Sequence, residues 1–283
     1  FLPVMPASLR TSGKSPQKVK NTVTAAPLAA AVVARISVGQ IRSRSPLQAT
    51  NSEPGSGVAT RFTWMSFGFW PATAMELLPA IDDSVEGVHF RRDWVSLGNA
   101  AERAFHAAVS DLAAMGAQPM AALSSLQLRP GASATELAEV RRAQARVTRA
   151  LDCPIIGGNV TRGEAFRFTT TVLGRVARPV LRSTAEPGHL VWLLGPVGLA
   201  GCGRAWLERG LPSRSTRSAL GRAIRVCVAA WRQPRAKLAE GRALRGRYHA
   251  AIDISDGLTS DLGHILERSQ VGALVHYARL PRS

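Results

Sequence analysis

Ten residues, Ile81–Phe90, decide how the rest of the chain is interpreted: Ile-Asp-Asp-Ser-Val-Glu-Gly-Val-His-Phe. The apolar run 77–81 precedes the acids and predicts a strand that ends in an acidic loop, where Gly87 lets the backbone turn. Carboxylates on such a loop suit a Mg²⁺–phosphate site, because this hard cation prefers oxygen ligands. A solvated acidic hairpin loop is the alternative, and this decapeptide taken alone favours it.

Similar polar clusters recur further along the chain. Gly157-Gly158-Asn159 and the segment Asp253–Asp256 each follow an apolar strand-like run. Asp111 lies near the C-terminal end of a predicted helix, where the helix dipole disfavours a carboxylate. Carboxylates that share a pocket repel one another unless cations neutralise them. The recurrence therefore favours a site for Mg²⁺ and a nucleoside triphosphate over the solvated loop.

Composition bounds the class of protein. The 283 residues are 46% hydrophobic and have a mean hydropathy of +0.01, which predicts a soluble globular protein without a membrane span. Three widely spaced cysteines form neither a disulfide framework nor a zinc spacing, so we expect a reduced, cytoplasmic setting. The net charge of +17 is high enough to suggest nucleic-acid binding. Arginines at helical spacing between 202 and 247, without interleaved aromatic residues, favour a solvated helix face instead.

The order of predicted elements indicates an α/β (α+β) fold. Residues 1–74 show no sustained period and are predicted to be disordered or foreign to the domain that follows. The predicted strands span 75–80, 119–128, 153–156, 166–176, 189–194, 248–254 and 271–277. Helices are predicted over 97–115, 133–151, 216–230 and 259–269, with two more that end near 209, after the glycine-rich run 195–203, and near 244, after Pro234. Asn99 or Ser96 is expected to cap the first helix, and Ser133 with Glu136 forms a capping box for the second.

Several catalytic signatures are missing. The chain contains no Walker A motif, no protein-kinase glycine loop with its partners and no G-x-S-x-G nucleophile elbow. The glycine-rich run 195–203 lacks the lysine and hydroxyl of a phosphate loop. Cys202 lies among glycines without evident His or Asn partners, which favours a structural thiol over a nucleophile.

Four segments together resemble thiamine-monophosphate kinase, a family within the ATP-binding superfamily of aminoimidazole ribonucleotide synthetase. They are Glu86-Gly87-Val88-His89-Phe90, Ser110-Asp111-Leu112-Ala113-Ala114-Met115-Gly116-Ala117, Ile156-Gly157-Gly158-Asn159 and Asp253-Ile254-Ser255-Asp256-Gly257-Leu258. The resemblance spans residues 75–281. It implies a two-domain PurM-like fold, with an N-terminal ATP- and Mg²⁺-binding domain over 75–180 and an incomplete C-terminal α/β domain over 181–283.

The resemblance also implies the activity, namely phosphorylation of thiamine monophosphate to thiamine diphosphate by ATP in a homodimer, with several Mg²⁺ ions and without membrane or nucleic-acid partners. Transfer would be direct and would need no general base, because the acceptor phosphate oxygen is already anionic. The implied metal ligands are Asp82, Asp111, Asn159, Asp253 and Asp256; the implied nucleotide contacts are Gly158, Asn159, Arg182 and Ser255; the implied substrate contact is His89.

The chain departs from the family pattern in several places, and three of them concern the candidate site. Residues 1–75 do not supply the family's Gly-Asp-Asp motif, Asn159 stands where Asp is usual, and the downstream Gly-Gly-Glu-Asp segment lies beyond Ser283. An amide oxygen can ligate a cation but brings no charge, so weaker metal binding is expected there. The alternatives are an inactive or nucleotide-binding-only fragment of this family, a selenophosphate synthetase-like enzyme, and a basic nucleic-acid binder.

Overall fold

The computed structural model describes residues 2–5, 36–39, 75–210, 218–276 and 280. The described strands are β1 (Leu2–Met5), β2 (Ile36–Gly39), β3 (Glu76–Val85), β4 (Gln118–Leu128), β5 (Ile155–Arg162), β6 (Arg167–Val176), β7 (Leu190–Val191), β8 (Ala250–Ile252) and β9 (Gly272–Leu274). The described helices are α1 (Leu97–Ala114), α2 (Ala134–Ala150), α3 (Leu199–Arg209), α4 (Ala219–Arg232), α5 (Leu238–Leu244) and α6 (Leu258–Ser269). The α/β (α+β) fold class is confirmed.

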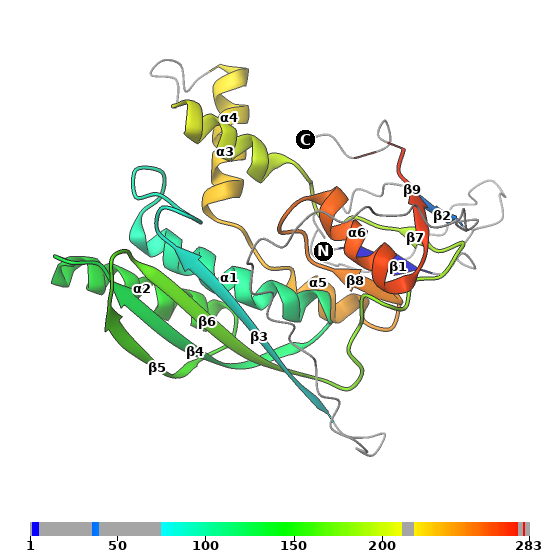
Figure 1. The fold of residues 1–283 in the computed structure, drawn as a ribbon, viewed down its shortest axis with the longest axis horizontal. Helices are drawn as coiled ribbons and strands as arrows, with labels where there is room; N and C mark the ends of the chain where they lie inside the picture. Colours follow the sequence, from blue (N-terminus) through cyan, green and yellow to red (C-terminus); the bar gives the residue numbers. More distant parts are fainter. Residues whose placement is uncertain (1, 6–35, 40–74, 211–217, 277–279, 281–283) are drawn as a thin grey trace, which may run out of the picture.

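Two sheets organise the chain (Figure 1). The larger strands form a four-stranded sheet in the order β3-β6-β4-β5, in which only the β4–β5 pair is parallel. The short strands form a second sheet in the order β8-β1-β7-β2-β9. Two strands of the second sheet, β1 and β2, come from the segment 1–74; the prediction for the rest of that segment lies outside the described residues.

Helix α1 packs against the first sheet and also contacts the second sheet. Its small residues Ala100, Ala104 and Ala108 are buried, and Phe105, Val109 and Leu112 pack with Leu78 and Val172 of the first sheet. Helix α1 also contacts α2 and α5 and reaches β8 of the second sheet. The helix therefore places whatever lies near its C-terminal end between the two sheets (Figure 1).

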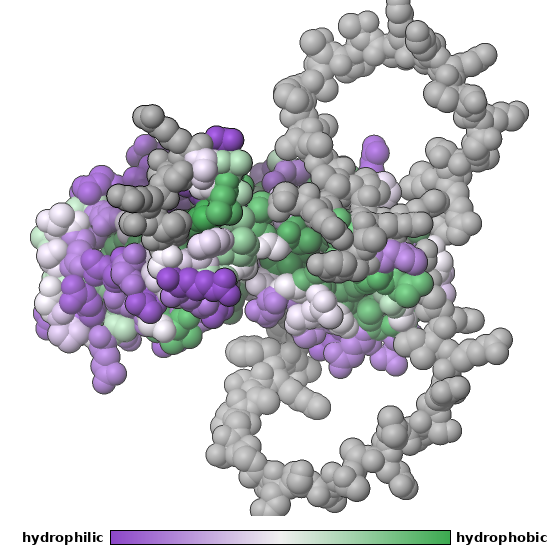
Figure 2. All heavy atoms as spheres, turned by 90° about the horizontal axis from the view of Figure 1, so that it is seen from above, coloured by the Kyte–Doolittle hydropathy of each residue, from purple (hydrophilic) through white to green (hydrophobic). Residues whose placement is uncertain are grey.

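Helices α3 and α4 pack on each other and on the first sheet's core rather than on the second sheet. Ile224, Val228 and Trp231 of α4 share a buried cluster with Phe90 and Phe168. The face seen in Figure 2 is largely hydrophilic over the body that holds the first sheet, at the left of the view. No helix in the described part of the chain is long and apolar enough to cross a membrane.

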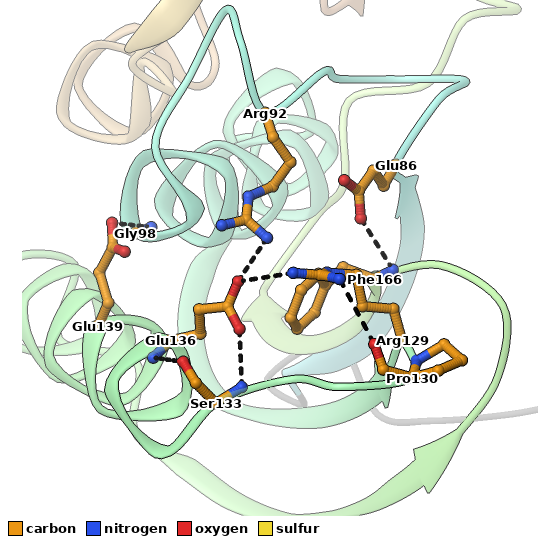
Figure 3. Close-up of polar contacts among 9 residues, drawn as sticks. All are labelled: Glu86, Arg92, Gly98, Arg129, Pro130, Ser133, Glu136, Glu139 and Phe166. Carbon is orange, nitrogen blue, oxygen red and sulfur yellow. Dashed lines mark hydrogen bonds and ion pairs between the residues drawn. The ribbon is translucent and has the colours of Figure 1, made fainter.

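The capping box at α2 is confirmed, and of the two cap candidates at α1, Ser96 rather than Asn99 is the cap. The Ser96 side chain accepts a hydrogen bond from the Asn99 amide at the start of α1. At α2, Ser133 and Glu136 form the complete capping box, and Arg92 and Arg129 add ion pairs to the Glu136 carboxylate (Figure 3). The four orphan amides at a helix start make such acceptors favourable, which is why these caps can be found from sequence.

Two predicted loops are strands, and those predictions were wrong. The acidic residues Asp82 and Asp83 lie inside β3, which continues to Val85 because β6 pairs with it along its whole length. The run Gly157-Gly158-Asn159 lies inside β5, an edge strand paired with β4, and most of β5 is exposed rather than buried. In both cases a partner strand distant in sequence extended the element past the predicted end.

Candidate functional site

One cleft of about 230 Å³ gathers most of the predicted site residues. It is lined by Asp82, Ala107, Asp111, Arg182, Ile252, Asp253, Ser255, Asp256, Asp261 and His264. These residues come from β3, from α1, from the segment after β6 and from the β8–α6 region, so the cleft lies where the two sheets meet along α1. Five carboxylates face only two basic side chains, which makes the cleft strongly acidic at neutral pH.

Asp82 reaches the cleft because side chains alternate along a strand. Cross-strand pairing puts Asp82 in a row with Thr170, Ser124 and Gly158. Thr170 is buried, so this row lies on the helix-covered face of the sheet. Burial raises the pKa of Asp82, and the nearby Asp253 carboxylate adds to the rise. Asp82 therefore carries a negative charge that its surroundings destabilise.

Asp111 faces the same cleft from the last turn of α1. Burial raises the pKa of its carboxyl group to about 6, and repulsion from Asp253 contributes, while Arg182 works in the opposite direction. The Arg182 guanidinium Nη2 lies 3.7 Å from Asp111 Oδ1, in an ion pair open to solvent. The prediction that a carboxylate at this helix end needs compensation agrees with this geometry, since one distant arginine compensates only part of its charge.

The segment between β8 and α6 supplies the opposite wall. Asp253 follows directly after β8, and its Oδ2 accepts a hydrogen bond from the Ser110 hydroxyl of α1. Three consecutive backbone amides, those of Ser255, Asp256 and Gly257, donate to a single oxygen of Asp261 at 3.0, 3.2 and 3.1 Å. These contacts fix the backbone that presents Asp253, Ser255 and Asp256 to the cleft.

Three residues with implied roles lie outside this cleft. Asn159 shares a cross-strand row with Asp83, Thr169 and Ser125, and therefore lies on the opposite face of the sheet from Asp82. Gly158 belongs to the Asp82 row, but a Cβ there would lie 1.8 Å from the Ser124 carbonyl oxygen, so packing alone demands glycine. His89 is exposed in the turn after β3, and its Nδ1 accepts a hydrogen bond from the Val85 amide at 3.0 Å.

Sequence reasoning missed Ser110, Asp261 and His264. Ser110 lies beside Asp111 in a segment already singled out, but its contact with Asp253 spans 143 positions in the sequence. Asp261 had a local signal, an acidic residue in the first turn of α6 shortly after a glycine. Such residues accept hydrogen bonds from free amides near helix starts. His264 follows Asp261 by about one turn, and this spacing places both on one side of α6.

The oxygen atoms that line the cleft are of the chemical type that binds Mg²⁺. Carboxylate oxygens are ligands that Mg²⁺ prefers, and the raised pKa values of Asp82 and Asp111 reflect charges that a cation would stabilise. Within the described residues, no three His, Cys, Asp or Glu side chains lie close enough together to hold a metal ion. This arrangement suits an ion held by one or two carboxylates, waters and substrate phosphates, which is the usual mode for Mg²⁺.

Comparison with known proteins identifies the lineage. Residues 69–176 match the family model described as AIR synthase related protein, N-terminal domain. The chain carries an AIR synthase related domain. It is also 34% identical over 204 residues to the thiamine-monophosphate kinase of Escherichia coli K12, an alignment that covers 71% of this chain. The resemblance stated from the sequence motifs is therefore confirmed.

Solved structures agree with this assignment. The thiamine-monophosphate kinase of Stenotrophomonas maltophilia K279a superimposes with a TM-score of 0.63 at 29% identity, over 71% of this chain and 63% of that one. A structure of AaThiL complexed with AMPPCP and TMP shares the fold with a TM-score of 0.61 at 24% identity, over 72% of this chain and 63% of that one. The chain spans 60% of the length of the Escherichia coli relative.

Proposed function

We propose that this chain phosphorylates thiamine monophosphate to thiamine diphosphate, with ATP as the phosphoryl donor and Mg²⁺ as the metal. The observation that carries the proposal is the convergence of Asp82, Asp111, Asp253 and Asp256 with Arg182 on one cleft. These residues come from four separate stretches of a chain similar to thiamine-monophosphate kinases. A cytoplasmic location is part of the same proposal.

The chemistry asks little of the protein beyond positioning and charge. The acceptor is a phosphate oxygen that is anionic near neutral pH, so no side chain has to remove a proton from it. Two polyanions must approach each other in line. Bound Mg²⁺ would supply the positive charge that lets phosphates enter a cleft lined by carboxylates. Arg182, half exposed at the edge of the cleft, is free to turn from Asp111 toward an entering phosphate.

Individual roles follow from position in the cleft. We propose Asp82, Asp111, Asp253 and Asp256 as metal-binding carboxylates, and Arg182 and Ser255 as nucleotide contacts. The roles that the resemblance implies for Gly158, Asn159 and His89 stay predictions. For Asn159 the face of the sheet matters, because a contact with the same nucleotide would have to reach it around the edge strand β5.

A homodimer is the proposed assembly. The open face of the first sheet carries exposed apolar side chains, with Leu77 60%, Ile81 65% and Leu123 42% exposed. Ile81 and Leu123 lie on either side of Thr171 in one cross-strand row, so these exposed apolar side chains share one face of the sheet. Exposed apolar side chains on a sheet face favour pairing with another protein surface, and a second copy of the same face is self-complementary. Light scattering of the purified protein gives the mass that tests this assembly.

The activity is tested by incubating the purified protein with ATP, thiamine monophosphate and Mg²⁺ and measuring ADP and thiamine diphosphate together. Equal amounts of the two products support the proposal. ADP without thiamine diphosphate would mean hydrolysis rather than transfer. A chain that folds, as judged by circular dichroism, yet yields neither product at high concentration contradicts the proposed activity.

Nucleotide binding without turnover is the second candidate. It is favoured by the absence of a preformed three-carboxylate cluster among the described residues. Calorimetric titration with AMPPCP and Mg²⁺ separates the two functions. Binding of this analogue combined with no thiamine diphosphate formation selects the binding-only function.

A further inference from the structure

We propose that Asp261 is a positioning residue for the cleft, holding the Ser255–Gly257 backbone so that Asp253, Ser255 and Asp256 face the nucleotide and its metal. This inference rests on the proposed function for its consequence and on hydrogen bonds for its geometry. Asp261 is not among the residues for which the family resemblance implies a role.

Asp261 combines burial with an unusual concentration of donors. The residue is 2% exposed, although it belongs to the lining of the cleft. One of its oxygens, Oδ2, accepts hydrogen bonds from three successive amides at 3.0–3.2 Å. Successive amides that point at one anion form a concave anion site, and here the anion is part of the chain itself. A buried carboxylate that lost these donors would be strongly destabilised.

The held segment has few other restraints. Gly257 has φ +116°, a conformation open to glycine, and it precedes α6 without any side-chain cap. Of the residues that the segment presents, Asp253 is additionally tied to Ser110. Ile254 and Leu258 anchor the two ends of the segment on the second core, and the Gly257 carbonyl accepts from the Asp261 amide. Between these anchors, the Asp261 carboxylate holds the amides of Ser255, Asp256 and Gly257. Small shifts of a positioned group reduce catalysis steeply, so this restraint has functional weight.

The same geometry limits where phosphate can bind. Backbone amides before a helix are a common phosphate site, since the helix dipole and free N–H groups both attract anions. At α6 the Asp261 carboxylate already occupies these amides. Phosphate groups must therefore be held elsewhere in the cleft, by Arg182 and by cations bound to the carboxylates. Asp261 thus both shapes the segment and keeps its amides from binding phosphate directly.

The test compares Asp261→Asn and Asp261→Ala with Glu267→Gln, an exposed acid on the same helix. Amide hydrogen exchange by NMR reports on the segment without any ligand. We expect exchange at Ser255, Asp256 and Gly257 to be about 10-fold faster or more in the Asp261 variants, because local opening becomes easier. The Glu267 variant should leave these rates unchanged.

The second measurement is AMPPCP binding as a function of Mg²⁺ concentration. The Asp261 variants should need about 10- to 100-fold more Mg²⁺ for half-maximal binding, as is typical when a partner supporting a metal ligand is removed. High Mg²⁺ should restore binding, a rescue that a general loss of stability would not give. Unchanged amide exchange overturns the proposal, as does faster exchange with an unchanged Mg²⁺ requirement.

The Asn variant has nearly the same shape as the wild type, so the test can still be made if the Ala variant does not fold. If both variants unfold, Asp261 serves the stability of the fold and the positioning role is overturned. If the wild-type chain binds no AMPPCP at any Mg²⁺ concentration, the proposed function fails, while the exchange rates still decide whether Asp261 holds the segment.

Discussion

Asp82 and Asp83 are adjacent in the sequence, yet the two faces of β3 give them opposite environments. Asp83 lies on the open face, where Arg167 Nε donates to its Oδ1 at 2.9 Å and the Thr169 hydroxyl donates at 2.7 Å. Partial burial disfavours its charge, but these hydrogen bonds outweigh burial and hold the pKa of Asp83 below its ordinary value. Asp82 lies on the helix-covered face, where burial and Asp253 raise its pKa.

Glu136 is a second acid whose negative charge is compensated by hydrogen bonds and ion pairs. Glu136 receives the Ser133 amide, Arg92 and Arg129, and these contacts lower the pKa of its carboxyl group to about 2 (Figure 3). Asp111 in the cleft has one arginine at 3.7 Å and a pKa of about 6. An acid whose charge is fully compensated serves the fold. Acids whose charge is left uncompensated beside one another are candidates for binding a cation.

Neutralising each acid in turn tests most directly whether the cleft acids and Asp83 differ in function. Asp82→Asn and Asp111→Asn should each lower kcat/KM for the proposed kinase by about 100-fold or more, because each removes charge that the metal and phosphates require. Asp83→Asn should change it by less than about 3-fold. Steady-state kinetics with thiamine monophosphate checks this. Equal losses in the Asp82 and Asp83 variants would contradict a functional difference between the two faces.

The adjacent glycines Gly157 and Gly158 of β5 differ in how closely other atoms pack against them. Gly158→Ala should lower the free energy of unfolding by about 1–3 kcal/mol, because the new Cβ would collide with the Ser124 backbone and force it to move. Gly157→Ala is the matched control, since its new Cβ meets only the end of the Leu123 side chain, at 3.2 Å. Urea unfolding measures both. If Gly158→Ala loses AMPPCP affinity with unchanged stability, a direct nucleotide role is favoured instead.

Because the pKa of Asp111 is raised, removing its charge is expected to stabilise the folded state at neutral pH. Its pKa of about 6 exceeds the ordinary 3.8, so the folded state binds the extra proton between these pH values. The contribution of Asp111 to stability therefore falls as pH rises from about 4 to 6. Asp111→Asn should raise the free energy of unfolding at pH 7 by about 1 kcal/mol, after allowance for a side chain that is 39% exposed.

Thermal unfolding of the ligand-free protein at several pH values checks this effect. The advantage of the Asn variant should shrink as pH falls and vanish only below the ordinary pKa of 3.8, at about pH 3, where Asp111 is protonated in both states. A variant that is less stable than the wild type at pH 7 would show that the charge of Asp111 is better compensated than its surroundings indicate.

The smallest expected effect concerns Asp83. Its lowered pKa contributes stability that is present above the ordinary pKa of 3.8 and is lost as pH falls through the lowered value. Asp83→Asn should lower the free energy of unfolding at pH 7 by about 0.5 kcal/mol, since the pair with Arg167 is open to solvent. Added salt should shrink the difference. Arg167→Gln offers a matched variant that removes the same pair from the other side.

Local sequence rules found most elements of the fold. Helices α1, α2 and α6 were placed within a few residues, and the caps Ser96 and Ser133 were identified, because periodicity and capping depend on neighbours along the chain. Four acids of the cleft, Asp82, Asp111, Asp253 and Asp256, were also found from sequence, as residues after strands or at a helix end, whereas Asp261 was missed. Their recurrence carried that prediction, together with a family resemblance that the comparisons confirm.

Strand limits and strand faces were harder to predict. The acidic stretch was predicted as a loop because Asp is uncommon in strands. Pairing with Thr169, Thr170 and Thr171 of β6 carries β3 through it regardless. The same holds for Gly157 and Gly158, which were predicted to follow the end of a strand and instead form part of an edge strand.

The sequence by itself indicated four of the cleft's acids, the family resemblance and the local caps, since these depend on residue types and short spacings. Only the tertiary structure decided that Asp82 enters the cleft while Asp83 and Asn159 face away from it, and that Asp261 holds the segment opposite. The physical reason is that a strand exposes alternate side chains to opposite faces. Which of the two faces is covered depends on packing with α1, and that contact is made by residues far apart in the chain.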